Sequence, residues 1–107
     1  MVFAMISESD WKKFKKLKEK ALDKLCGLAL QDCKEAINDP VRSDHEKYLH
    51  LYELVQNHGE RIVRVFNEHA RSKAHFQLTL MKLEGLIEEA DIQAFSAEIQ
   101  ELLRRQG

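Results

Sequence analysis

The sequence predicts an all-α protein, and three observations support this fold class. Glycine and proline are scarce, with four glycines and one proline in 107 residues, and charged residues make up 33% of the chain. Apolar residues recur every three or four positions over long segments, which is the period of one helix face. No Asn-Gly or Asp-Gly turn separates alternating apolar runs, so strands are not expected. At this length we expect a single domain over residues 1–107.

The first helix is expected from about residue 8 to residue 37. Ser7 and Asp10 stand at the two positions of a capping box, and the apolar period continues across Gly27. Asn38-Asp39-Pro40 ends this helix, because proline disfavours helical geometry in the residue before it.

The central helix is expected over about residues 44–84, and Ser43 and Glu46 form a capping box at its start. Its apolar stripe comprises Tyr48, Leu51, Tyr52, Val55, Ile62, Phe66 and Ala70. Gly59 falls in phase with this stripe, which favours close approach of another backbone over a helix end after His58. The stripe weakens at Arg71-Ser72-Lys73. We favour a continuous helix there, and a break near Ser72 is the alternative.

The last helix is expected over about residues 88–105. Gly85 is a suitable C-cap for the central helix, and Ile87 can pack on Ile92 as a hydrophobic staple at the start of the last one.

The helix lengths favour a dimer. At 1.5 Å per residue the three helices would be about 45, 60 and 27 Å long. Short connections make each outer helix antiparallel to the central one, so the outer helices barely overlap and a monomer is two helices deep. We therefore predict an elongated antiparallel helical bundle of three long helices, completed by an isologous homodimer. The alternative is a monomeric four-helix up-down bundle with a break near Ser72.

A basic segment of the first helix is one candidate contact surface. It consists of Trp11, Lys12, Lys13, Lys15, Lys16 and Lys20. A basic amphipathic helix with an aromatic anchor can lie on an anionic membrane or contact nucleic-acid phosphates. We favour the simpler interpretation of a solvated face around a core stripe, which the acidic segment 84–103 could complement within the dimer.

Three arginines form a second candidate, because Arg61, Arg64 and Arg71 lie close together in the sequence and could bind an anion. Glu60 and Glu68 are interspersed among them, so we favour local ion pairs as the explanation.

We expect neither a catalytic site nor a metal or cofactor site. No two of the five histidines are three or four residues apart, and the sequence contains no phosphate loop, nucleophile elbow or zinc spacing. Cys26 and Cys33 would lie about 10 Å apart on one helix, too far for a disulfide between them, which favours a reduced, cytoplasmic protein. Residues 1–6 are too short for a signal peptide, and no apolar run approaches the roughly 20 residues of a membrane span.

No motif assigns an activity, so the function is unknown at this point and three hypotheses are open. The leading one is a non-enzymatic helical protein-interaction or regulatory module that acts as a homodimer. The second is non-specific binding of nucleic acid or anionic membrane through the basic first helix. The third is a small all-helical enzyme, since the expected order of long, long and short helices resembles the all-helical chorismate mutases in outline. That family places arginine on its first helix, whereas this chain has no arginine before Arg42, so no site residue is carried over.

Overall fold

All the elements are helices in the computed structural model, which describes residues 6–67 and 71–106. In chain order they are α1 (Glu8–Ile37), α2 (Asp44–Phe66), the 3-10 helix η1 (Arg71–Lys73), α3 (Ala74–Leu83), α4 (Glu89–Gln93) and α5 (Ala97–Gln106). The all-α class is therefore confirmed, as are the bounds of the first helix.

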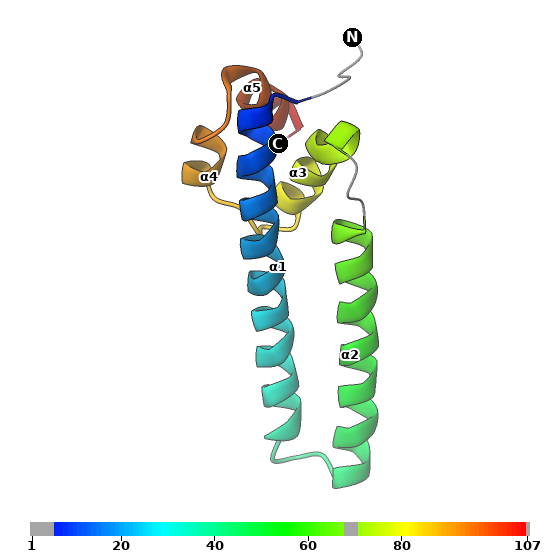
Figure 1. Cartoon of the computed structure of the whole chain (residues 1–107). Coiled ribbons are helices and arrows are strands. Elements are labelled where there is room, and N and C mark those ends of the chain that lie inside the picture. Colours follow the sequence, from blue (N-terminus) through cyan, green and yellow to red (C-terminus); the bar gives the residue numbers. More distant parts are fainter. Residues whose placement is uncertain (1–5, 68–70, 107) are drawn as a thin grey trace.

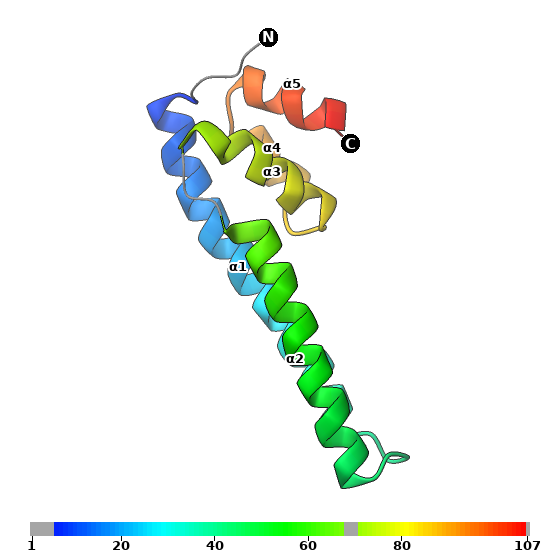
Figure 2. The same cartoon turned by 90° about the vertical axis from the view of Figure 1, so that its right-hand side faces the viewer.

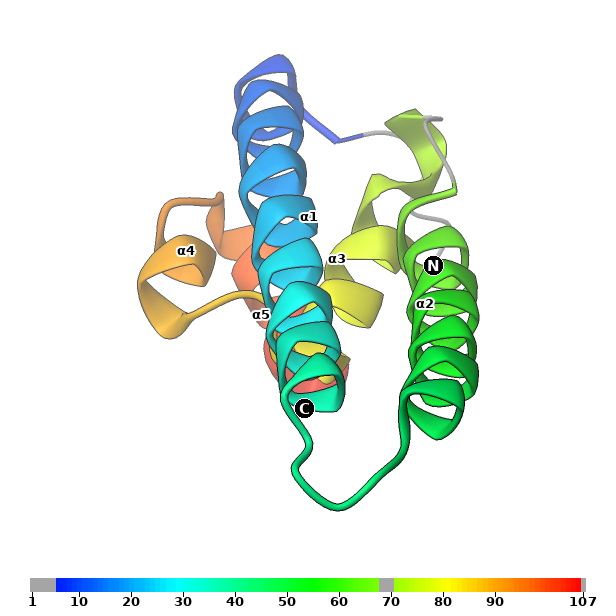
Figure 3. The ribbon, with the colours of Figure 1, turned by 90° about the horizontal axis from the view of Figure 1, so that it is seen from below.

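The two long helices form an antiparallel hairpin, and the shorter helices gather at one end of it (Figure 1). We call α3, α4, α5 and the N-terminal half of α1 the head. Figure 2 shows the other half of the hairpin projecting from the head, and Figure 3 shows α4 and α2 on opposite sides of α1. The molecule measures 54 × 24 × 22 Å, and its radius of gyration of 17.0 Å exceeds the roughly 13 Å of a compact domain of this length.

The central helix is not continuous, so the prediction of one helix over residues 44–84 is wrong. α2 ends at Phe66, and the next described element is η1. The predicted alternative of a break near Ser72 is correct in kind, although α2 ends several residues before Ser72. Ala70, which we assigned to the stripe, lies outside the described residues. The break lets Phe66 of α2 and Leu78 of α3 enter one core with α1, which a straight helix could not achieve.

The C-terminal segment is also broken, so the prediction of one helix over residues 88–105 is wrong. α4 ends at Gln93 and α5 begins at Ala97, directly after Ser96. The Ser96 hydroxyl accepts a hydrogen bond from the Ile99 backbone N–H at 3.5 Å, as an N-cap does. With the second and third helices both divided, the outline of long, long and short helices is lost.

The local start and stop signals are largely correct. The capping box of Ser43 and Glu46 is complete, with distances of 2.9 and 3.2 Å. Gly85 has φ of +72°, and the N–H groups of Gly85 and Leu86 donate to the carbonyls of Lys82 and Met81. This pattern is the Schellman motif, which satisfies the last carbonyls of α3.

Asp10 has a different role from the one predicted. The Ser7 hydroxyl accepts from the Asp10 backbone N–H at 3.1 Å, but the Asp10 side chain turns toward α5. It accepts hydrogen bonds from the Ser96 N–H at 3.0 Å and the Ser96 hydroxyl at 2.6 Å. Because Asp10 is only 3% exposed, this contact fixes the start of α5 against the start of α1 inside the head.

The core lies in the head and at the adjoining end of α2. Its largest fully buried side chains are Phe14, Leu25, Val65, Gln77, Leu78, Met81, Ile99 and Leu103. Between residues 26 and 64, by contrast, Ala36 is the one side chain that is buried. The part of the hairpin that projects from the head, which we call its outer half, therefore consists of two helices only and encloses almost no core (Figure 2).

Candidate interaction surface

A row of apolar residues runs along α2, all of them exposed except the half-buried Gly59, and we call it the outer stripe. It consists of Tyr48, Tyr52, Val55, Gly59 and Val63. The four side chains are between 56% and 68% exposed. The steps of four and three residues between neighbours match the seam that one helix presents to another in a coiled coil.

The outer stripe is distinct from the face of α2 that meets α1. Leu51, Leu54, Ile62 and Val65 are half-buried or buried, and their positions lie roughly 100° around the helix from the outer stripe. The predicted stripe mixed these two faces, because it combined Leu51 and Ile62 with Tyr48, Tyr52 and Val55. The hairpin thus uses one apolar face internally and leaves the other uncovered within the described residues.

Gly59 lies at the centre of the outer stripe and inside α2, so it does not end the helix. A Cβ added there would meet no atom within 4 Å, so the predicted close approach of another backbone is not made within the described parts of the chain. The missing side chain leaves a surface hollow lined by Gln56, Gly59, Glu60, Val63 and Arg64. A glycine inside a helix costs about 1 kcal/mol relative to alanine, and no contact at Gly59 among residues 6–67 and 71–106 offsets that cost.

The two helices of the hairpin are joined by a polar contact. His58 Nε2 and Asp32 Oδ2 are 2.9 Å apart, and the His58 side chain is only 14% exposed. Their pairing depends on the register between the helices, for which the sequence carries no local signal.

Further apolar side chains are exposed outside the outer stripe. They are Leu28, Leu30 and Ile37 on α1, Val41 in the connecting turn, Leu49 on α2, and Phe76 and Leu83 on α3. Five of these seven residues lie between residues 26 and 64, so the exposed apolar surface concentrates on the part of the hairpin that contributes almost nothing to the core. Contiguous exposed apolar surface on a protein usually marks an interaction site.

The predicted basic surface is only partly free. Trp11 is half-buried and stacks on Phe14 at 5.5 Å, so the tryptophan packs against the core and does not project as a membrane anchor. Lys13 donates to the Ala94 carbonyl at 2.6 Å, and Lys20 pairs with Asp91 at 3.2 Å. Lys12, Lys15 and Lys16 are exposed, with the Lys15 ammonium 5.7 Å from the centre of the Trp11 ring.

The three predicted arginines are divided between two places. Arg61 and Arg64 both pair with Glu84, which ties α2 to the end of α3. Arg71 instead pairs with Glu8 at 2.7 Å and donates to the Ile6 carbonyl at 3.0 Å, holding η1 against the start of α1. These partners are distant in sequence, whereas the predicted partners were the neighbouring Glu60 and Glu68, the latter outside the described residues.

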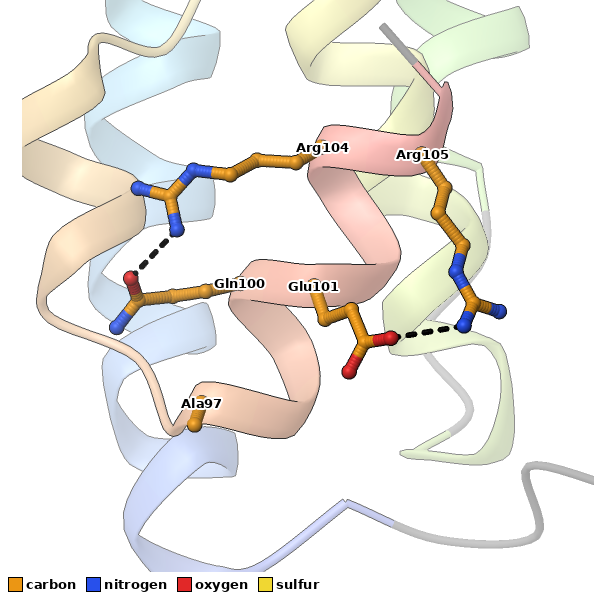
Figure 4. Close-up of a pocket in the computed structure, with 5 residues that line it drawn as sticks. All are labelled: Ala97, Gln100, Glu101, Arg104 and Arg105. Carbon is orange, nitrogen blue, oxygen red and sulfur yellow. Dashed lines mark hydrogen bonds and ion pairs between the residues drawn. The ribbon is translucent and has the colours of Figure 1, made fainter.

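A hollow along α5 offers little to a ligand. Figure 4 shows that all five residues lining it come from this single helix: Ala97, Gln100, Glu101, Arg104 and Arg105. Arg104 donates to Gln100 at 2.9 Å and Arg105 to Glu101 at 2.7 Å. Because one helix cannot enclose a ligand on several sides, this hollow lacks the concave form of a small-molecule site.

Asp91 connects α4 to α1 and should make the stability of the head sensitive to acid. Burial raises the pKa of the Asp91 carboxyl, but hydrogen bonds from the Glu88 backbone N–H and from Lys20 outweigh it, so the pKa lies below its usual value. A carboxyl whose pKa is lowered on folding stabilises the fold above its unfolded pKa of about 3.9 and loses this contribution as pH falls through the folded pKa.

We therefore expect the urea midpoint to fall as the pH is lowered below about 4. The Asp91→Asn chain should be less stable at neutral pH and should lose less stability on acidification. Asp23→Asn, at an exposed position of α1, is the control and should keep the wild-type profile. Identical acid profiles for Asp91→Asn and the wild type would contradict this role.

Three further observations limit the chemistry of the described residues. No group of three or more His, Cys, Asp or Glu side chains in residues 6–67 and 71–106 could hold a metal ion. Cys26 and Cys33 are both free and half-buried. None of the helices in the described part of the chain is long and apolar enough to cross a membrane.

The comparisons with known proteins add no assignment. No protein-family model, curated protein or solved structure matched this chain. The interpretation of the surface therefore rests on its own geometry.

Proposed function

We propose that this chain is a small helical protein-interaction module that acts as a homodimer, with the hairpins of two copies packed against each other. One observation carries the proposal: the outer stripe of α2 presents four large apolar side chains along one helix face, each more than half exposed. Alone, the outer half of the hairpin has two helices in cross-section. A second hairpin packed on this stripe would give a cross-section of four helices, which can enclose a core.

The size of the hairpin face suits a stable dimer. α2 has 23 residues and is therefore about 34 Å long, and two adjacent helices are about 20 Å wide. One face of the hairpin thus offers roughly 700 Å², close to the approximately 800 Å² that each partner buries in a standard interface. The formal net charge of −1 adds little repulsion between two copies.

A second copy is a better occupant of this face than a nucleic acid or an anionic membrane surface. The outer stripe is apolar and has the period of a helix-to-helix seam, which suits an identical helix. The basic surface of α1 offers weaker support for the second predicted function, because Lys13, Lys20 and Trp11 already have contacts inside the head. In this proposal the module acts by binding and not by catalysis, in a reducing compartment such as the cytoplasm.

Size-exclusion chromatography with light scattering at about 0.1 M and 1 M salt tests the proposal. We expect a particle of twice the 12.5 kDa chain mass at both salt concentrations, since an apolar interface is not weakened by screening. A monomer at every concentration tested would overturn the proposal. A dimer that dissociates only at high salt would indicate a charged interface and contradict the role of the outer stripe.

A further inference from the structure

Gly59 occupies a place in the outer stripe where nothing in the described chain requires a glycine. Its φ is not in the left-handed region, in which Gly85 is the one residue found among those described. An added Cβ would meet no atom within 4 Å. Neither backbone conformation nor packing inside this chain therefore explains why an apolar stripe lacks a side chain at its centre.

Gly59 lies between two exposed apolar residues of the outer stripe. Val55 and Val63 lie one turn before and one turn after it, and both are more than half exposed. The hollow beside Gly59 is lined by Val63 and by the polar Gln56, Glu60 and Arg64. Val55 does not line it, but lies on the same face of α2 as Gly59 and Val63, because residues four apart lie nearly in line along a helix. A notch flanked by apolar side chains lets a second helix approach more closely than the usual 8–10 Å between helix axes.

We infer that two copies of the chain pack α2 against α2 and that the two helices cross at Gly59. This inference rests on the proposed homodimer and specifies its geometry. In an isologous dimer the same patch is used by both copies, so Gly59 of one copy faces Gly59 of the other across the two-fold axis. Val55 and Val63 of each copy then close the contact on either side of the crossing, and Tyr52 extends it toward the tip of the hairpin.

Gly27 of α1 provides a matched comparison. It also lies inside a long helix, it is exposed, and an added Cβ would meet nothing within 4 Å. The residues one turn away from it are the exposed, polar Asp23 and Gln31. Gly27 therefore shares with Gly59 an interior helix position and open space for a Cβ, although it is more exposed and does not lie in the outer stripe.

The test compares Gly59→Ala with Gly27→Ala in the full chain. The dimer dissociation constant is measured by dilution with light scattering, and the urea midpoint is measured at concentrations where each protein is monomeric. We expect Gly59→Ala to weaken the dimer at least tenfold and Gly27→Ala to change its Kd less than twofold. Both variants should keep or raise the urea midpoint of the monomer, because alanine is the better helix former and has space at both positions.

Three other results would contradict the crossing at Gly59, and one of them would also contradict the homodimer. If the wild type is a dimer and Gly59→Ala leaves its Kd within twofold, the crossing at Gly59 is overturned while the proposed homodimer stands. A Gly59→Ala monomer with a lowered urea midpoint would also overturn it, because the glycine would then serve the fold of the single chain. A wild type that stays monomeric overturns both the crossing and the proposed function.

Discussion

Replacement of Asp10 by alanine is expected to destabilise the fold by about 3 kcal/mol. The Asp10 carboxylate is almost completely buried and accepts two hydrogen bonds from Ser96, one from its N–H and one from its hydroxyl. Alanine would remove both of these hydrogen bonds, and a hydrogen bond to a charged group contributes about 1.5–3 kcal/mol. The substitution would also remove a negative charge from the first turn of α1, beside the start of α5, where helix dipoles favour one.

Urea unfolding followed by circular dichroism measures this effect. Asp10→Asn retains an oxygen acceptor and the shape of the side chain, so it should lie between Asp10→Ala and the wild type. Ser9→Ala is the control, because Ser9 is the exposed neighbour of Asp10 on α1 and should change stability by less than about 0.5 kcal/mol. An Asp10→Ala chain as stable as Ser9→Ala would show that the contact with Ser96 contributes nothing.

A double-mutant cycle with Ser96→Ala separates this pair from its surroundings. If Asp10 and Ser96 act on each other directly, the combined loss of stability will be smaller than the sum of the single losses by about 1 kcal/mol or more. Additive losses would mean that each side chain stabilises the head through other contacts.

The parts of the fold predicted from the sequence are those encoded within one turn of a helix. The starts of α1 and α2 follow from the side chains of Ser7 and Ser43, which meet backbone N–H groups three residues later. The end of α3 follows from Gly85, whose positive φ few other residues tolerate. Such signals need no knowledge of the tertiary structure, and this is why they were detected.

The break in the central helix was predicted only as the alternative, and the break in the last helix was not predicted, because the contacts that cause them are distant in the sequence. Arg71 is held by Ile6 and Glu8 at the other end of the chain, and Ser96 by Asp10. The apolar period alone favours continuation, since Phe76 and Leu80 resume the spacing after the break. A serine ahead of Ile99 could have suggested the N-cap of α5, but an interior serine is also compatible with a continuous helix.

The candidate surface was predicted in composition but not in arrangement. The sequence identified Tyr48, Tyr52, Val55 and Gly59 as one stripe but assigned them to the same face as Leu51 and Ile62. The apolar period predicts a helix with an apolar side. It does not predict which part of that side an adjacent helix of the same chain covers. The predicted dimer relied on a central helix of about 60 Å, which is absent. The proposed dimer relies on the uncovered outer half of the hairpin.

Replacement of Tyr52 by glutamate is expected to convert the proposed dimer into a monomer, with dimer affinity reduced more than about 100-fold. Tyr52 is 58% exposed in the single chain, so glutamate there should be tolerated by the fold, with a change in stability of less than about 0.5 kcal/mol. In the proposed dimer the same position is covered by apolar side chains of the second copy. Two symmetry-related carboxylates would then be desolvated without a cationic partner, at a cost of several kcal/mol.

Asn57→Glu is the matched control for this variant. Asn57 is an exposed residue of the same helix, two positions from Val55 and therefore on nearly the opposite side. It introduces the same charge without touching the outer stripe, so its dimer should persist. Light scattering across a dilution series and the urea midpoint of each monomer together decide the outcome. If both glutamates weaken the dimer equally, net charge governs self-association. If only Tyr52→Glu does so while the monomer stays folded, the outer stripe of α2 is the interface.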